Sequence, residues 1–235
     1  MSLPVLETLA LKSAAAGALS LAFRGAPENA SAIDRLAATA LGGAIGLIAY
    51  AAWPAWARAL VADDLANLIE AQRRYLGLVL QAYAEPSTDE AALRAAQIAA
   101  WRARSNAEAS VDQMAGEPVR PHAIDLRTAR GILAATRRLG IAGLTLRARI
   151  ARVEGAPHAI VDRFTRDLDT ALSAIVAAQR SSEPSAPLPP LRNDQIALKR
   201  ILDERRDPVV EVLVSETDLI VDSVNAVAAL LRRRR

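Results

Sequence analysis

The chain of 235 residues contains no cysteine, and aromatic residues make up only 3% of it. The absence of cysteine excludes disulfides, thiolate metal sites and thiol nucleophiles. Lysine occurs only as Lys12 and Lys199, so arginine carries nearly all of the positive charge. The formal net charge of +3 is too small to indicate a nucleic-acid partner, and we expect none.

Sequence motifs for catalysis and cofactor binding are also missing. The chain has no Walker loop, no G-x-S-x-G and no H-E-x-x-H. His122 and His158 each follow a proline at an expected helix start, with no other ligand residues clustered beside them. We interpret both as exposed polar residues. We therefore expect no enzyme activity, no catalytic residue, no cofactor and no metal site.

One long segment, Leu36–Ala57, contains no charged residue. As a helix it would extend about 33 Å, which is enough to cross a hydrocarbon core of about 30 Å. Tyr50, Trp53 and Trp56 recur every three residues near its end, and Arg58 follows. Aromatic residues on one helix face favour the membrane–water interface. The segment therefore predicts a transmembrane helix; the alternative is a buried helix of a soluble core.

Small residues recur every four positions along this segment, at Ala38, Gly42 and Gly46. They would form a smooth face on which another transmembrane helix can pack closely. Pro54 has no backbone N–H, so we expect a kink or a helix end there.

The segment Leu3–Phe23 is apolar but is interrupted by Glu7 and Lys12, which are costly within a bilayer. We interpret it as a marginal second span, with a signal peptide as the alternative. We therefore divide the chain into a membrane region, residues 1–57, with its expected span at 36–57 and an uncertain span at 3–23, and a cytosolic helical domain, residues 58–235.

Beyond Arg58 the apolar residues show the three- and four-residue spacing of amphipathic helices. We predict a first helix that ends at Glu85 and a second that starts at a Ser87–Glu90 capping box and ends near Gly116. In this second helix Trp101 is the expected large core residue. Small residues at every third or fourth position would allow close packing, at Ala92, Ala96, Ala99, Ala103 and Ala107.

A third helix is predicted over Pro121–Glu154 and a fourth after Pro157. The core face of the third should comprise Ala129, Ile132, Thr136, Leu139, Gly143, Leu146, Ile150 and Val153. That of the fourth should comprise Val161, Phe164, Leu168, Leu172 and Ile175. The two should pack in an antiparallel bundle.

The stretch Ser181–Pro190 contains four prolines, which favour an extended connection, either a linker or a strap lying on the bundle. Two more helices should follow, over Arg192–Arg206 and from Val209 to the terminus. The last has an apolar stripe at Leu213, Ile220, Val224, Val227 and Leu231. The predicted fold is all-α, with one or two transmembrane helices followed by an antiparallel cytosolic bundle.

The third predicted helix is rich in arginine, with Arg130, Arg137 and Arg138 near its middle and only Asp125 and Glu154 as acidic residues. These arginines are candidates for a surface that binds phospholipid headgroups or carboxylate substrates. The alternative is neutralisation by acidic residues of neighbouring helices. No aromatic residues interleave them, which argues against nucleic acid.

Several motifs occur in the order found in the fusaric acid resistance (FUSC) family of bacterial inner-membrane proteins, and the chain resembles the C-terminal portion of that family. The matching pieces are Arg35 and Thr39 with Gly42, WPAWAR at 53–58, EAQRRYL at 70–76, RARSNAEASVDQMAGEP at 102–118 and SETDLIVDSVNAVAALL at 215–231. Ala38 stands where family members usually have glycine.

The resemblance implies a transport component for export of small, aromatic organic acids, placed in the bacterial inner membrane with its C-terminal domain in the cytoplasm. It also implies the lipid bilayer, other transmembrane helices and a periplasmic adaptor protein as partners. Because the family has several spans and this sequence holds one or two, we expect the chain to be incomplete for transport on its own, either as a fragment, as a truncated reading frame or as the partner of a separate multispan chain. We expect its spans to pack with transmembrane helices of another copy or of a multispan partner. The alternative function is a membrane-anchored interaction or scaffold domain without translocation activity.

Overall fold

The computed structural model describes residues 38–46, 54–84, 89–116, 124–150, 158–181, 186–205 and 208–233. The described residues form helices joined by turns and short irregular segments, with no strand among them, so the predicted all-α class is confirmed. The chain forms two compact units, Met1–Trp53 and Pro54–Arg235. In the first unit, the described residues form one helix over 38–46.

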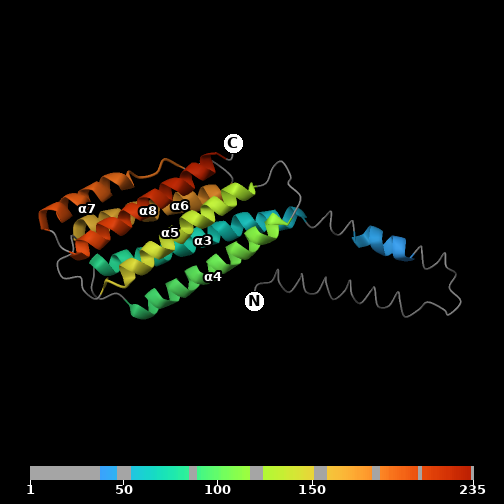
Figure 1. Cartoon of the computed structure of the whole chain (residues 1–235), viewed down its shortest axis with the longest axis horizontal. Coiled ribbons are helices and arrows are strands. Elements are labelled where there is room, and N and C mark those ends of the chain that lie inside the picture. The colour runs from blue at the N-terminus through green and yellow to red at the C-terminus, as the bar shows by residue number, and fades with distance from the viewer. Residues whose placement is uncertain are drawn as a thin grey trace. The chain divides into compact units, whose positions relative to one another are not determined.

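The second unit is a bundle of six helices within the described ranges (Figure 1). They are α3 (Pro54–Ala84), α4 (Glu90–Ala115), α5 (Leu126–Arg147), α6 (His158–Ser181), α7 (Leu191–Arg205) and α8 (Pro208–Arg232). α3 packs against α4, α5 and α6, whereas α8 packs against α5, α6 and α7. Successive helices run antiparallel (Figure 1), as predicted.

The core is built from the apolar stripes that the sequence shows. In α5, Ala129, Ile132, Thr136, Leu139, Gly143 and Leu146 are all buried, and so are the five predicted residues of α6. Tyr75, Tyr83 and Phe164 are its largest fully buried side chains. A side chain that repeats every 3.6 residues stays on one helix face, which is why the stripe could be found from sequence.

The predicted core contribution of α4 was right for Ala107, which is buried, and for Ala96 and Ala103, which pack against the core, but wrong for Trp101. Trp101 is 69% exposed, whereas Leu93, Ala100 and Ala107 are buried together with Val111. α4 lies at the edge of the bundle, where it packs against α3 and α5, so only a narrow stripe of it is covered. Trp101 follows Ala100 by one position, about 100° further around the helix, and points outward.

The start of α4 also differs from the prediction. Asp89 is its N-cap, and the Asp89 carboxylate accepts a hydrogen bond from the Ala91 N–H at 2.8 Å. Glu90 is therefore the first helical residue and is not the third residue after a Ser87 cap. A carboxylate at the N-cap also interacts favourably with the positive end of the helix dipole.

α5 is shorter than the predicted Pro121–Glu154. The Asp125 carboxylate caps its N-terminus by accepting from the Thr128 N–H at 2.8 Å, and the helix ends at Arg147. Residues 121–123 and 151–154 lie outside the described residues. α7 and α8 agree with the predicted ranges to within one residue at their starts.

The proline-rich segment is described over residues 186–190, where Leu188 packs against the core. The Pro189 carbonyl accepts a hydrogen bond from the Leu191 N–H at 2.8 Å, so the segment leads directly into α7. For these residues the strap alternative describes the chain better than the linker.

Candidate functional site

The predicted span motif lies only in part within the described residues. Thr39, Gly42 and Gly46 belong to the helix 38–46, and a Cβ atom at either glycine would meet no neighbour within 4 Å. Within the described residues these glycine positions are therefore uncovered, and glycine is the kind of residue that lets another helix approach closely. Arg35, Tyr50 and Trp53 lie outside the described residues, as do the side chains of Trp56 and Arg58.

Among the helices that the structure describes, none is both long enough and apolar enough to cross a membrane. Residues 36, 37 and 47–53 of the expected span are outside the described part of the chain.

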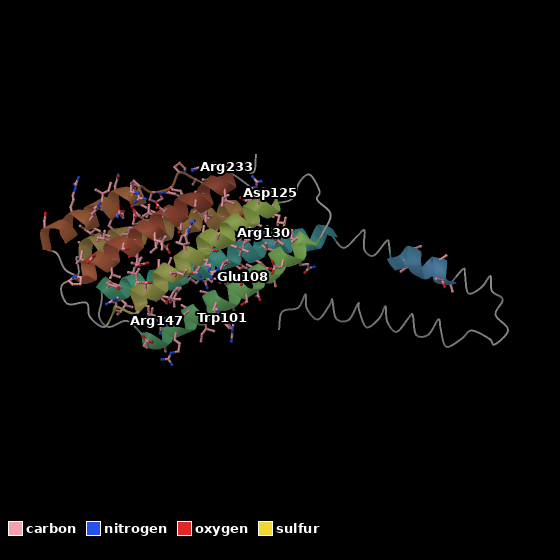
Figure 2. All side chains as sticks on the ribbon, viewed as in Figure 1. Trp101, Glu108, Asp125, Arg130, Arg147 and Arg233 are labelled. Carbon is pink, nitrogen blue, oxygen red and sulfur yellow. The ribbon has the colours of Figure 1, made fainter. Side chains whose placement is uncertain are left out.

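Three of the predicted site residues, Arg130, Arg137 and Arg138, are exposed on α5 (Figure 2 labels Arg130). The buried stripe of α5 faces α3 and α8, and helical periodicity places these arginines on the opposite side together with Arg127. We call Arg127, Arg130, Arg137 and Arg138 the α5 arginine face. No described carboxylate forms an ion pair with any of the four.

Arg147, on the same helix, behaves differently. Its side chain is 19% exposed, and its Nη2 lies 2.5 Å from the Glu90 Oε1 atom of α4. Nη1 of the same guanidinium donates to the Gln97 side chain. Neutralisation by a neighbouring helix, the alternative for the arginines of this helix, therefore applies to Arg147 but not to the α5 arginine face within the described residues.

Acidic groups that could balance the α5 arginine face are few. The sequence of α5, Leu126–Arg147, contains no aspartate or glutamate. The preceding carboxylate, Asp125, is engaged at the cap, and the hydrogen bond from the Thr128 hydroxyl lowers the pKa of Asp125. An anion that approaches this face would meet guanidinium groups able to form charge-assisted hydrogen bonds.

Apolar side chains continue the α5 arginine face along the helix. Ile141 is 48% exposed and Leu144 is 47% exposed. Both follow Arg137 at helical spacing, so the same side of α5 presents a basic half and an apolar half. Such a surface suits a ligand that has both an anionic and an apolar part, such as an aromatic carboxylate or a phospholipid.

Sequence reasoning missed a polar cluster between α6 and α7. Asp194 is only 3% exposed, and its Oδ1 atom lies 2.6 Å from the Nε atom of Arg163. Its Oδ2 atom is buried without a hydrogen-bond partner. Burial raises the pKa of Asp167, and the neighbouring negative charge of Asp194 raises it further. Nothing in the local sequence marks Asp194 as buried, because its contacts come from another helix.

Within the described residues, no three histidine or carboxylate side chains come together as a metal site would require. No family model, curated protein or solved structure matches the chain. The class that the fold and the site define is therefore an α-helical bundle with a basic, solvent-facing helix.

Proposed function

We propose that the chain is a membrane transport component of the FUSC type, which takes part in exporting small, aromatic organic acids from bacteria. The observation that carries the proposal is the uncharged segment Leu36–Ala57, which continues in the sequence directly into α3. The ordered resemblance described above supports it. In this proposal the first unit is inserted in the inner membrane and the bundle lies in the cytoplasm.

The α5 arginine face gives the proposal a site for the substrate. Guanidinium groups at Arg137 and Arg138 would attract carboxylates, and Ile141 and Leu144 would contact the aromatic part. Export also needs a pore, so the face of Thr39, Gly42 and Gly46 would pack against transmembrane helices of another copy or of a multispan partner. A periplasmic adaptor protein would complete the path.

Carbonate extraction of membranes tests the span. The full chain should stay in the membrane pellet. Ile45→Arg should move a large fraction to the supernatant, because a cation near the bilayer centre costs about 2.5 to 3.5 kcal/mol on insertion scales. Ile45→Leu is the matched control and should stay in the pellet. Recovery of the parent chain in the soluble fraction would rule out the span.

Efflux of an aromatic acid tests transport. Cells that express the chain together with a multispan partner of the FUSC type should retain less acid than cells with either part alone. Gly42→Leu and Gly46→Leu should abolish this difference, because bulky side chains separate the packed helices. Ala40→Leu, which also introduces a leucine but on another face of the helix, should not abolish it. Equal efflux from all variants would contradict the packing face.

One observation favours the second candidate function, a membrane-anchored interaction or scaffold domain. Trp101 and Ile98 are 69% and 44% exposed on neighbouring positions of α4, and such residues are typical of protein-binding surfaces. If this function is right, Trp101→Ala should abolish binding of a partner while aromatic acid efflux stays at its background value in every combination of chains.

A further inference from the structure

Arginines that are far apart in the sequence come together at one end of the bundle. We call this the proximal end, since it is where α3 starts at Pro54, directly after the expected span. The Gln179 side chain at the end of α6 donates to the Ala62 carbonyl of α3 at 3.2 Å. The last turns of α6 therefore also lie at the proximal end.

The first turns of α5 reach the same end. Tyr75 of α3 donates a hydrogen bond to the Gly143 carbonyl of α5 at 3.4 Å, and a Cβ atom on Gly140 of α5 would lie 3.2 Å from the Gln72 side chain of α3. In both contacts the α5 residue comes 68 positions after its α3 partner in the sequence. Two parallel helices with equal rise keep this offset. Arg130 is therefore level with about residue 62 of α3.

The last turns of α8 join them. A Cβ atom on Gly131 would lie 2.7 Å from the Leu230 Cδ1 atom, so α8 passes the first turns of α5 just before it ends. Arg232 and Arg233 follow Leu230 and are exposed. Figure 2 shows Arg233, Arg130 and Asp125 at the same end of the bundle. The sequence continues with Arg234 and Arg235, outside the described residues.

We define Arg127, Arg130, Arg232 and Arg233 as the proximal arginines. None of them forms an ion pair with a carboxylate of the described ranges. The described carboxylates of this end are Asp63, Asp64, Asp112 and Asp125. Asp63, Asp64 and Asp112 belong to α3 and α4, whereas the arginines belong to α5 and α8. Asp125 lies on the side of the arginines, directly before α5, and is engaged as the cap of that helix, so one of these carboxylates stands there against four arginines. The α5–α8 side of the proximal end is therefore positive.

We propose that the proximal arginines bind anionic phospholipid headgroups, so that the bundle docks on the membrane by the α5–α8 side of its proximal end. This proposal rests on the membrane association proposed above, because the sequence enters the bundle at this end. Arginines next to an anionic leaflet attract its phosphates over about one Debye length, roughly 8 to 10 Å.

The distance dependence separates the proximal arginines from the rest of the α5 arginine face. Arg137 lies ten residues after Arg127, or about 15 Å further along the helix axis, which is more than a Debye length. Arg137 and Arg138 are also exposed, and replacing both with glutamine also removes two positive charges. They therefore provide a matched control for Arg127 and Arg130.

The test uses the full chain with a single labelled cysteine, which is simple because the sequence has none of its own. A fluorophore is placed at Ala134→Cys in α5 or at Ala148→Cys, the C-cap of α5; both positions are exposed, and they lie about 21 Å apart along the helix axis. The protein is mixed with nanodiscs that carry a headgroup quencher, made of phosphatidylcholine alone or with phosphatidylglycerol. Quenching at position 134 reports docking of the proximal end.

We expect phosphatidylglycerol to increase quenching at position 134 but not at 148. R127Q/R130Q should lower the docking constant about 30-fold, which corresponds to ~1 kcal/mol for each arginine. R232Q/R233Q should act in the same direction. R137Q/R138Q should leave quenching within about twofold of the parent chain. High salt should remove the dependence on phosphatidylglycerol.

Four results would overturn the proposal. Equal quenching in both kinds of nanodisc would show that anionic lipid is not the ligand. An equal decrease of the docking constant in R127Q/R130Q and R137Q/R138Q would show that the whole α5 face lies on the membrane. Equal quenching of fluorophores at positions 134 and 148 would show the same. Displacement by millimolar inorganic phosphate at constant ionic strength would indicate a site for a soluble anion. The quenching measurement does not require the expected span to insert into the bilayer. It therefore tests docking of the bundle even if carbonate extraction rules out the span.

Discussion

Arginine side chains in this bundle fall into two groups, and their partners distinguish them. Arg73 of α3 pairs with Glu70 at 2.8 Å and also donates to Asp169 of α6, and Arg192 of α7 bridges Asp218 and Asp222 of α8. The hydrogen bond from Arg73 lowers the pKa of Glu70 to about 2, so this group remains charged at any ordinary pH. Such arginines join helices, whereas those of the α5 arginine face form no ion pair with a described carboxylate and are available to a ligand.

Gly143 allows α5 to approach α3 closely, and we predict that Gly143→Ala destabilises the bundle. The added Cβ would lie 2.8 Å from the Tyr75 ring and 3.1 Å from Leu76, both of which are fully packed. Overpacking of this kind costs about 1 to 3 kcal/mol. Urea unfolding of the full chain in mild detergent, followed by circular dichroism, measures the change in the free energy of unfolding.

Gly77→Ala is the control for this prediction. A Cβ at Gly77 would meet nothing within 4 Å, so the better helix propensity of alanine should stabilise the protein by about 0.5 to 1 kcal/mol. If both variants changed stability in the same direction, the close contact between α3 and α5 would be wrong.

The pair Asp167 and Asp194 predicts an unusual pH dependence. Because the pKa of Asp167 is raised in the folded state, its ionisation costs stability as the pH rises above the value of the unfolded chain, 3.8. Asp167→Asn should therefore raise the melting temperature at about pH 7 and change it little at about pH 3. The exposed Asp162→Asn, on the same helix, is the control and should show no such difference. An equal effect of Asp167→Asn at both pH values would contradict the raised pKa.

Among the elements, α4 is the least embedded and α6 the most clearly amphipathic. Trp101 of α4 is 69% exposed, whereas Phe164 of α6 is fully buried. Trp101→Ala should change the free energy of unfolding by less than about 0.5 kcal/mol, and Phe164→Ala should lower it by about 3 to 5 kcal/mol. Thermal unfolding of the two variants decides between this arrangement and the sequence-based one, in which Trp101 is a core residue.

α8 is predicted to be held by its buried stripe and not by its terminal charges. Ile220 is fully buried, so Ile220→Asp should place an uncompensated charge in the core, at a cost of about 3 to 5 kcal/mol. Limited proteolysis of the full chain should then cleave α8 more rapidly. Asn225→Asp, at an exposed position of the same helix, and deletion of Arg232–Arg235 should leave the cleavage rate unchanged. Cleavage of Ile220→Asp at the rate of the parent would contradict the docking of α8.

At the scale of the whole molecule, the six helices of the bundle share one core, and the positive charge of the bundle is concentrated on α5 and at the end of α8. The proposed topology places this bundle in the cytoplasm. A fluorescent protein fused after Arg235 should therefore fluoresce, because it folds in the cytoplasm, and an alkaline phosphatase fused at the same position should be inactive, because it needs oxidising conditions for its disulfides. The opposite pair of results would place the bundle on the other side of the membrane.

The sequence by itself determined the all-α class and the core faces of α5, α6 and α8, because apolar residues with helical spacing mark a buried face without reference to any other part of the chain. Phe164, Leu139 and Ile220 are examples. The tertiary structure alone decided that Trp101 is exposed, that Arg147 is paired and that the proximal arginines share one end of the bundle. These properties depend on contacts between residues far apart in the chain, such as Gly131 with Leu230 and Glu90 with Arg147, and such contacts leave no local pattern.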